Sequence, residues 1–180
     1  MIRSPKNQSR IPRVNSNVDI KHRFEQFLTE LIEQDDLMAS YLRDAIFPGR
    51  RSRPILFLQL TENAASEQER FSIAAALEFI HRASIITDDL IDQDELRRKI
   101  PTFHVKHGSN TTVLVSNYLV ARSFGLLKNI VDERHRNELG QIIANALVSM
   151  VRGESCDIGL LRNMNITNYI DILLLKTSSL

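Results

Sequence analysis

The spacing of apolar residues is the feature that most constrains the fold of this chain. From Ile20 to Ile46, apolar side chains return at intervals of three and four residues, which is the period of an amphipathic helix. No segment shows the alternation of apolar and polar residues, bounded by turn residues, that indicates a half-buried strand. We interpret the apolar run 55–60 as the start of a buried helix, because a strand there would have no partner. The sequence therefore predicts an all-α protein.

Cap and turn residues divide the rest of the chain into helices joined by short polar links. A long helix rich in alanine and leucine is predicted over 66–91, with Ser66 as its N-cap and Glu69 as the capping-box partner three residues later. A polar segment over 93–108 follows this helix. Further helical stretches are predicted over 112–130, 133–161 and 167–180. The expected architecture is a helical bundle without internal repeats.

Composition limits the classes of protein that need to be considered. With 180 residues and 43% apolar side chains, the chain can bury one core. Its 23 lysines and arginines balance 22 acidic residues, so no general attraction to nucleic acid or to an anionic membrane is expected. Cys156 is the single cysteine, which excludes an internal disulfide and fits a reducing cytoplasm. Because no uncharged apolar stretch reaches about 18 residues, the sequence predicts a soluble, cytoplasmic protein without a membrane span.

The first 17 residues differ in character from the rest of the chain. Arg3, Lys6, Arg10 and Arg13 lie there together with two prolines and no acidic residue. We interpret residues 1–17 as a flexible basic arm. An organelle transit peptide is the alternative, but no amphipathic period runs through the segment.

A group of carboxylates closes the long helix. Asp88 and Asp92, four residues apart, project from one face of the helix about one turn from each other. Asp94 and Glu95 follow directly, although negative charge is disfavoured at a helix C-terminus. Such a group needs cations for compensation, and its oxygen atoms are ligands that Mg²⁺ prefers. An acidic helix end that is simply solvated by water is the alternative.

Positive residues next to this group favour a ligand with several negative charges. Arg97, Arg98 and Lys99 follow the carboxylates, and guanidinium groups beside a metal site suit a diphosphate. His81 lies two turns before Asp88 on the same helix face and could donate to a phosphate oxygen. A single histidine on a helix is more often a partly buried structural residue.

Several segments resemble those of the trans-type polyprenyl diphosphate synthases. Residues 78–92, followed by 97–102 and a histidine, are similar to the first aspartate-rich motif of this family. Residues 49–54 resemble its glycine-lysine-arginine-x-arginine-proline element, and the segment 176–180 also falls in the family's order. The resemblance covers 18–180. It implies the N-terminal part of a helical bundle of the isoprenoid synthase type, truncated.

The resemblance implies a magnesium-dependent prenyltransferase that condenses isopentenyl diphosphate with an allylic diphosphate. Asp88 and Asp92 would hold Mg²⁺ ions that bridge the allylic diphosphate, and Arg97 would contact the same group. Lys176 and Thr177 would reach it from a later helix. Asp88, Asp92, Arg97 and Lys176 form the expected catalytic set.

A second set of residues is implied for isopentenyl diphosphate. The resemblance assigns its binding to Arg50, Arg53, His81 and Arg98. Arg50 stands where the family usually has lysine, so the positive charge is kept on a bulkier, planar group. A class I terpene cyclase also ionises its substrate with metal ions. It has no second substrate to hold, and this set of residues argues against that function.

Small residues near the acidic group bear on the product. Ala83 and Ser84 precede Asp88 by about one turn, at positions where short-chain enzymes of this family often have an aromatic ring. A medium- or long-chain polyprenyl product is therefore favoured. Ordinary close packing of helices through small residues is the alternative.

The chain also departs from the family pattern. Asn117 replaces an aspartate that is common there, and the second aspartate-rich motif, which would follow residue 180, is absent from the sequence. The resemblance implies pairing, so we expect a homodimer or a complementing synthase subunit. The alternative function is a non-catalytic helical subunit, or a truncated remnant, that binds or regulates a complete synthase.

Overall fold

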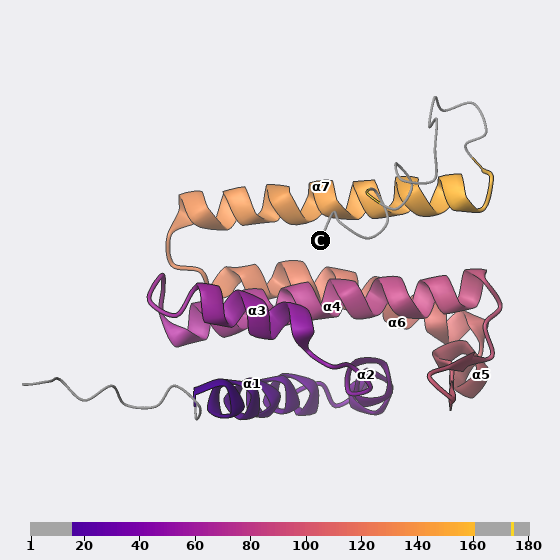
Figure 1. The fold of residues 1–180 in the computed structure, drawn as a ribbon, viewed down its shortest axis with the longest axis horizontal. Coiled ribbons are helices and arrows are strands. Elements are labelled where there is room, and N and C mark those ends of the chain that lie inside the picture. Colours follow the sequence, from indigo (N-terminus) through magenta and orange to yellow (C-terminus); the bar gives the residue numbers. More distant parts are fainter. Residues whose placement is uncertain (1–15, 161–173, 175–180) are drawn as a thin grey trace, which may run out of the picture.

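The computed structural model describes residues 16–160 and residue 174, and they form a bundle of helices (Figure 1). The long helices are α1 (Ser16–Glu33), α4 (Glu67–Ile91), α6 (Ser109–Leu126) and α7 (Glu133–Asp157). The shorter elements are α2 (Ala39–Ile46), α3 (Ser52–Leu60), β1 (Leu96–Arg97), β2 (Ile100–Pro101), α5 (Phe103–His107) and the 3₁₀ turn η1 (Leu127–Asn129). The predicted all-α class is confirmed.

Helix α4 is the centre of the bundle, and its most extensive contacts are with α6. Its start is fixed by the predicted capping box: Ser66 Oγ accepts from the Glu69 N–H, and Glu69 Oε2 accepts from the Ser66 N–H. Its alanines and Phe79 lie in the core, and the ring of Phe71 packs edge-on against Phe24 of α1 at 5.8 Å between centroids. The buried middle of α4 thereby holds its acidic end in a fixed place.

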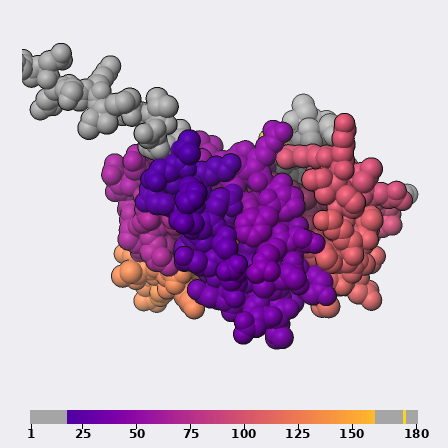
Figure 2. Space-filling model, turned by 90° about the horizontal axis from the view of Figure 1, so that it is seen from below, coloured from indigo at the N-terminus to yellow at the C-terminus, as the bar shows by residue number. Residues whose placement is uncertain are grey.

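Helices α1, α2 and α3 form one outer face of the molecule (Figure 2). Helix α7 runs along the opposite side of α4 (Figure 1). The side chains of α1 that face inward, such as Phe24, Leu28 and Ile32, are fully buried. The helical periodicity read between Ile20 and Ile46 is confirmed, except that a turn over 34–38 divides it into α1 and α2.

Several predicted boundaries need correction. The polar segment 93–108 contains a hairpin of two short strands and helix α5, which were not predicted. The expectation that strands would be absent is wrong at this point. Helix α6 begins at Ser109 rather than at 112, and α7 ends at Asp157 rather than at 161.

The hairpin escaped sequence analysis because its turn lacks the usual turn residues. Arg98 and Lys99 both have positive φ, 53° and 67°, a conformation that favours Gly and Asn. Each strand has only two residues, which is too short for an alternating pattern. Only the contacts of the folded protein specify this turn.

Some predictions fall outside the described part of the chain. The basic arm lies almost wholly in 1–15, and all of the stretch 167–180 except residue 174 is likewise not described. Among the helices that are described, none is long and apolar enough to cross a membrane.

Candidate functional site

The acidic end of α4 places its carboxylates on two sides of the helix. Asp88 lines a cavity of about 490 Å³ between α4, α6 and α7, and Asp92, one turn later, is exposed. The Asp92 N–H donates to the Asp88 carbonyl at 2.8 Å, so the helix stays intact up to this residue. Asp89 is on the other side of the helix and only 2% exposed. Asp88 and Asp92 therefore lie one turn apart at the end of α4, as predicted.

The donor set at this end fits a magnesium ion that is shared with a ligand. No group of three or more His, Cys, Asp or Glu side chains among the described residues could hold a metal ion by itself. Mg²⁺, however, is usually bound by one or two carboxylates together with water and phosphate oxygens. Asp88, at the cavity, and Asp92, in solvent, supply such a pair of hard oxygen ligands.

Asp89, for which the sequence predicted no role, holds Arg97. The Arg97 Nε–H donates to Asp89 Oδ1 at 2.6 Å. Burial raises the pKa of the Asp89 carboxyl, and the hydrogen bond and charge of Arg97 oppose that rise. The only signal in the sequence was a carboxylate on the inner side of the helix, where a charge needs a partner. Arg97 is thereby fixed beside the last turn of α4.

The hairpin brings the two arginines that follow the acidic group back to α4. Thr102 closes its base, because the Thr102 N–H donates to the Glu95 carbonyl at 3.0 Å and the hydroxyl to the Asp94 carbonyl at 2.7 Å. Arg97 and Arg98 line a second, smaller cavity of about 100 Å³ on the Asp89 side of the helix. The structure therefore places Arg98 beside Arg97, at the end of α4.

His81 and Arg53, both expected to bind isopentenyl diphosphate, touch each other. Arg53 Nη1 lies 3.0 Å from His81 Nε2, and because a guanidinium can only donate, Nε2 is the acceptor and the ring proton is on Nδ1. Burial lowers the pKa of His81 to about 4, and nearby arginines, Arg53 first, contribute to the shift. His81 is therefore neutral at pH 7, and the N–H it can offer a phosphate oxygen is at Nδ1.

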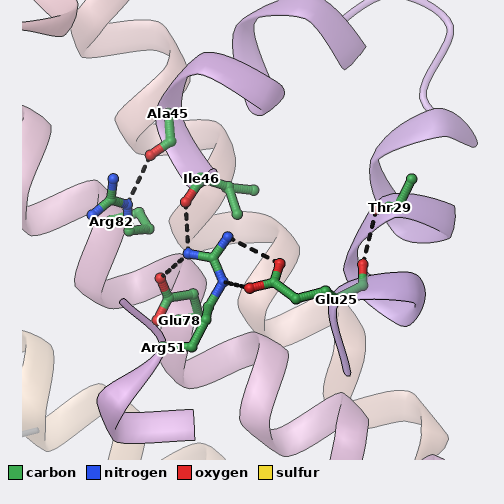
Figure 3. A network of polar contacts seen from close by, with 7 residues as sticks. All are labelled: Glu25, Thr29, Ala45, Ile46, Arg51, Glu78 and Arg82. Atoms are coloured by element: carbon green, nitrogen blue, oxygen red, sulfur yellow. Dashed lines mark hydrogen bonds and ion pairs between the residues drawn. The ribbon is translucent and has the colours of Figure 1, made fainter. Parts of the chain in front are cut away.

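The segment before α3 carries Arg50, which was also expected to bind isopentenyl diphosphate, and its neighbour Arg51, to which no role was assigned. Arg50 is exposed, whereas Arg51 is buried. Figure 3 shows the Arg51 guanidinium between Glu25 of α1 and Glu78 of α4, close to the Ile46 carbonyl. The sequence gives the charge of Arg50 and Arg51 but not the direction of their side chains, so it could not tell the exposed arginine from the buried one.

The larger cavity begins at Asp88 and continues between apolar side chains. Ala83 and Ser84 line it, as predicted from their position one turn before Asp88. Thr87 and Ser116 hold α4 and α6 together across it, with 2.8 Å between their hydroxyl oxygens. An elongated apolar group that ends in a diphosphate would fit the order of these residues, with its charged end at Asp88.

Lys176 and Thr177 lie outside the described residues. Their predicted approach to the diphosphate therefore stays a prediction. Asn117, one of the departures from the family pattern, is exposed and lines the larger cavity beside Ser116.

Comparisons with known proteins show which proteins this chain is similar to. The family model for polyprenyl synthetase matches residues 35–180. A short chain isoprenyl diphosphate synthase of Methanocaldococcus jannaschii is 28% identical over 165 residues, which are 90% of this chain and 50% of the relative. A farnesyl diphosphate synthase of Bacillus subtilis is 33% identical over 147 residues, 77% of this chain and 50% of the relative. The solved geranyltransferase of Legionella pneumophila superposes with a TM-score of 0.80 at 30% identity, covering 91% of this chain and 63% of that one.

These matches cover most of this chain but only part of the relatives. The chain spans about half the length of the curated relatives it matches. The family match itself includes the whole acidic end of α4, the hairpin and the arginines before α3. The chain belongs to the polyprenyl synthetase family.

Proposed function

We propose that this chain provides the diphosphate-binding part of a prenyltransferase, which condenses isopentenyl diphosphate with an allylic diphosphate. One observation carries the proposal: the carboxylate of Asp88 stands at an apolar cavity, and the arginines of two separate segments converge on the same helix. The names of the relatives, an isoprenyl and a farnesyl diphosphate synthase, support the same class of reaction.

The allylic diphosphate would be bound at the end of α4. Asp88 and Asp92 would hold Mg²⁺, and Arg97, kept in place by Asp89, would contact the phosphate oxygens. Bound magnesium would supply positive charge for the departing pyrophosphate. The cavity lined by Ala83 and Ser84 would hold the hydrocarbon and exclude water from it.

Isopentenyl diphosphate would be bound by Arg50, Arg53, His81 and Arg98. Its double bond would then attack the allylic carbon as the carbon–oxygen bond breaks and its electrons leave with pyrophosphate. A proton lost from the new chain restores an alkene, and pyrophosphate can accept it. The chain's own part is to orient both substrates and to neutralise the charge that develops.

Two further features bear on product length and on partners. Small side chains at Ala83 and Ser84 leave the space beyond Asp88 open, which supports a medium- or long-chain product. Exposed apolar side chains on α6 and α7, such as Leu114 and Ile142, support a second copy or a complementing synthase subunit that covers them.

The direct test is incorporation of radiolabelled isopentenyl diphosphate by the full chain, with Mg²⁺ and allylic primers of increasing length. We expect magnesium-dependent elongation that is lost in Asp88→Asn and kept in Asp36→Asn, a control at an exposed aspartate between α1 and α2. Equal incorporation by Asp88→Asn would contradict the role of Asp88. Ser84→Phe should shorten the product, and an unchanged product ladder would overturn the proposal on chain length.

A further inference from the structure

Arg51, just before α3, places a fully buried charge among the helices. Its side chain has 0% exposure, and it reaches α1, the end of α2 and α4 at once (Figure 3). Its Nη1 donates to Glu78 Oε1 at 2.8 Å and to the Ile46 carbonyl at 2.7 Å. Its Nε lies 3.1 Å from Glu25 Oε1, and its Nη2 donates to Glu25 Oε2 at 3.4 Å. One guanidinium therefore ties three helices together.

Stability alone does not account for such a cluster. Removing a guanidinium and a carboxylate from water costs about as much as their attraction returns, and apolar residues of similar volume often stabilise a fold equally well. Glu78 is itself only 1% exposed, and burial raises its pKa while Arg51 and Arg82 oppose the rise. We infer that the cluster fixes the backbone conformation around Arg51.

That backbone is unusual in two places. Arg51 has φ 61°, a left-handed conformation that residues with a side chain rarely adopt unless their surroundings impose it. Gly49 lies so close that a Cβ there would come within 2.4 Å of Arg51 Nη1 and 2.7 Å of Glu78 Oε1. A side chain at position 49 would therefore displace the Arg51 guanidinium or the Glu78 carboxylate, so Gly49 and Arg51 depend on each other.

The fixed segment carries the arginines that the proposed function assigns to isopentenyl diphosphate. Arg50, next to Arg51, is exposed, and Arg53, one residue into the first turn of α3 beyond Ser52, contacts His81 at 3.0 Å. His81 lies one helical turn after Glu78 on α4. The buried contact at Arg51 and the contact at Arg53 therefore join the same segment to the same stretch of α4.

We propose that Arg51, held by Glu25 and Glu78 and overlain by Gly49, is a positioning residue for the isopentenyl diphosphate site. It touches no substrate, and it sets the direction in which Arg50 and Arg53 present their guanidinium groups. This inference rests on the proposed function and adds a requirement beyond positive charge. Position 51 must carry a guanidinium group, and position 49 must carry no side chain.

The test measures binding, so that it does not depend on turnover. The full chain is titrated with isopentenyl diphosphate by calorimetry, for the wild type, Arg51→Lys and Gly49→Ala. Arg51→Lys keeps the positive charge but loses the planar guanidinium group with its several donors. Gly49→Ala keeps Arg51 but displaces its guanidinium group. Both should weaken binding on the order of ten- to a hundredfold, since misplacing a substrate-positioning group by about 1 Å can cost up to about a hundredfold in rate.

Arg70→Lys is the matched control. Arg70 is another buried arginine of α4, and it donates to the Leu58 carbonyl at 2.7 Å and to the Glu62 carbonyl at 3.1 Å, at the far end of α3. It should lower the unfolding temperature as Arg51→Lys does and leave the dissociation constant of isopentenyl diphosphate unchanged. In the Arg51→Lys background, Gly49→Ala should reduce the affinity for isopentenyl diphosphate little further, because Gly49 acts through the Arg51 guanidinium group.

The outcomes separate this inference from the proposed function. Binding that is equal in the wild type, Arg51→Lys and Gly49→Ala overturns the positioning role while the proposed function stands. An equal loss in Arg70→Lys shows a general structural effect and also overturns it. If the wild type binds no isopentenyl diphosphate, the proposed function fails and this inference fails with it.

Discussion

Two segments bring arginines to α4, and they are held in opposite ways. The segment before α3 is anchored inside the protein, because Arg51 is buried between two carboxylates and presents its neighbours outward. The hairpin after α4 is anchored at its edge, by a contact between the half-exposed Arg97 and the buried Asp89. Both segments contain residues with positive φ, but only the first surrounds that strain with buried contacts. The first segment should be the rigid one, and the hairpin should adjust when a ligand binds.

The largest expected loss of stability comes from removing the buried ion pairs of Arg51. Arg51→Met leaves Glu78 buried without its main cation, so it should lower the free energy of unfolding by about 3 kcal/mol. Urea denaturation followed by circular dichroism measures this. A loss below about 1 kcal/mol would show that the network does not constrain this segment.

The matching change at the outer anchor should cost less. Arg97→Met leaves the Asp89 carboxylate without its hydrogen bond, but the Arg97 side chain is 45% exposed and water can replace part of the interaction. We expect a loss of about 1 kcal/mol in the same urea experiment. A loss equal to that of Arg51→Met would remove the difference between the two segments.

The burial of His81 beside Arg53 should show itself in the pH dependence of stability. Because the pKa of His81 falls from 6.5 to about 4 on folding, the unfolded chain binds more protons between these values. Stability should therefore fall as the pH is lowered from 6.5 toward 4, and this contribution should be absent in His81→Gln. Urea denaturation at pH 7 and pH 5 tests it, and identical pH dependence in both proteins would contradict the burial of a neutral His81.

The smallest effect is expected at the tip of the hairpin. Lys99 has φ 67°, so Lys99→Gly should stabilise the protein by up to about 0.5 kcal/mol or leave it unchanged. Lys21→Gly, at an exposed site inside α1, should instead destabilise by about 1 kcal/mol. Thermal unfolding of the two variants compares them, and a clear loss in Lys99→Gly would show that the turn is supported by contacts of Lys99.

Helix α4 and the two segments beside it show which features could be predicted from the sequence. Helix α4, its capping box and the common face of Asp88 and Asp92 followed from local spacing, because a long helix with regular apolar residues leaves few alternatives. The roles of Arg51 and Asp89 did not follow, since both depend on residues that are distant in sequence or on the inner side of a helix. The hairpin did not follow either, because Arg98 and Lys99 occupy turn positions that normally require Gly or Asn.

The central claim, that Asp88 and Asp92 at the end of α4 bind a diphosphate through magnesium, is tested most directly by calorimetric titration with inorganic pyrophosphate. We expect the wild type and Asp36→Asn to bind pyrophosphate only with Mg²⁺, and the double variant Asp88→Asn, Asp92→Asn to lose that magnesium dependence. Magnesium-dependent binding of equal strength in the double variant would contradict it.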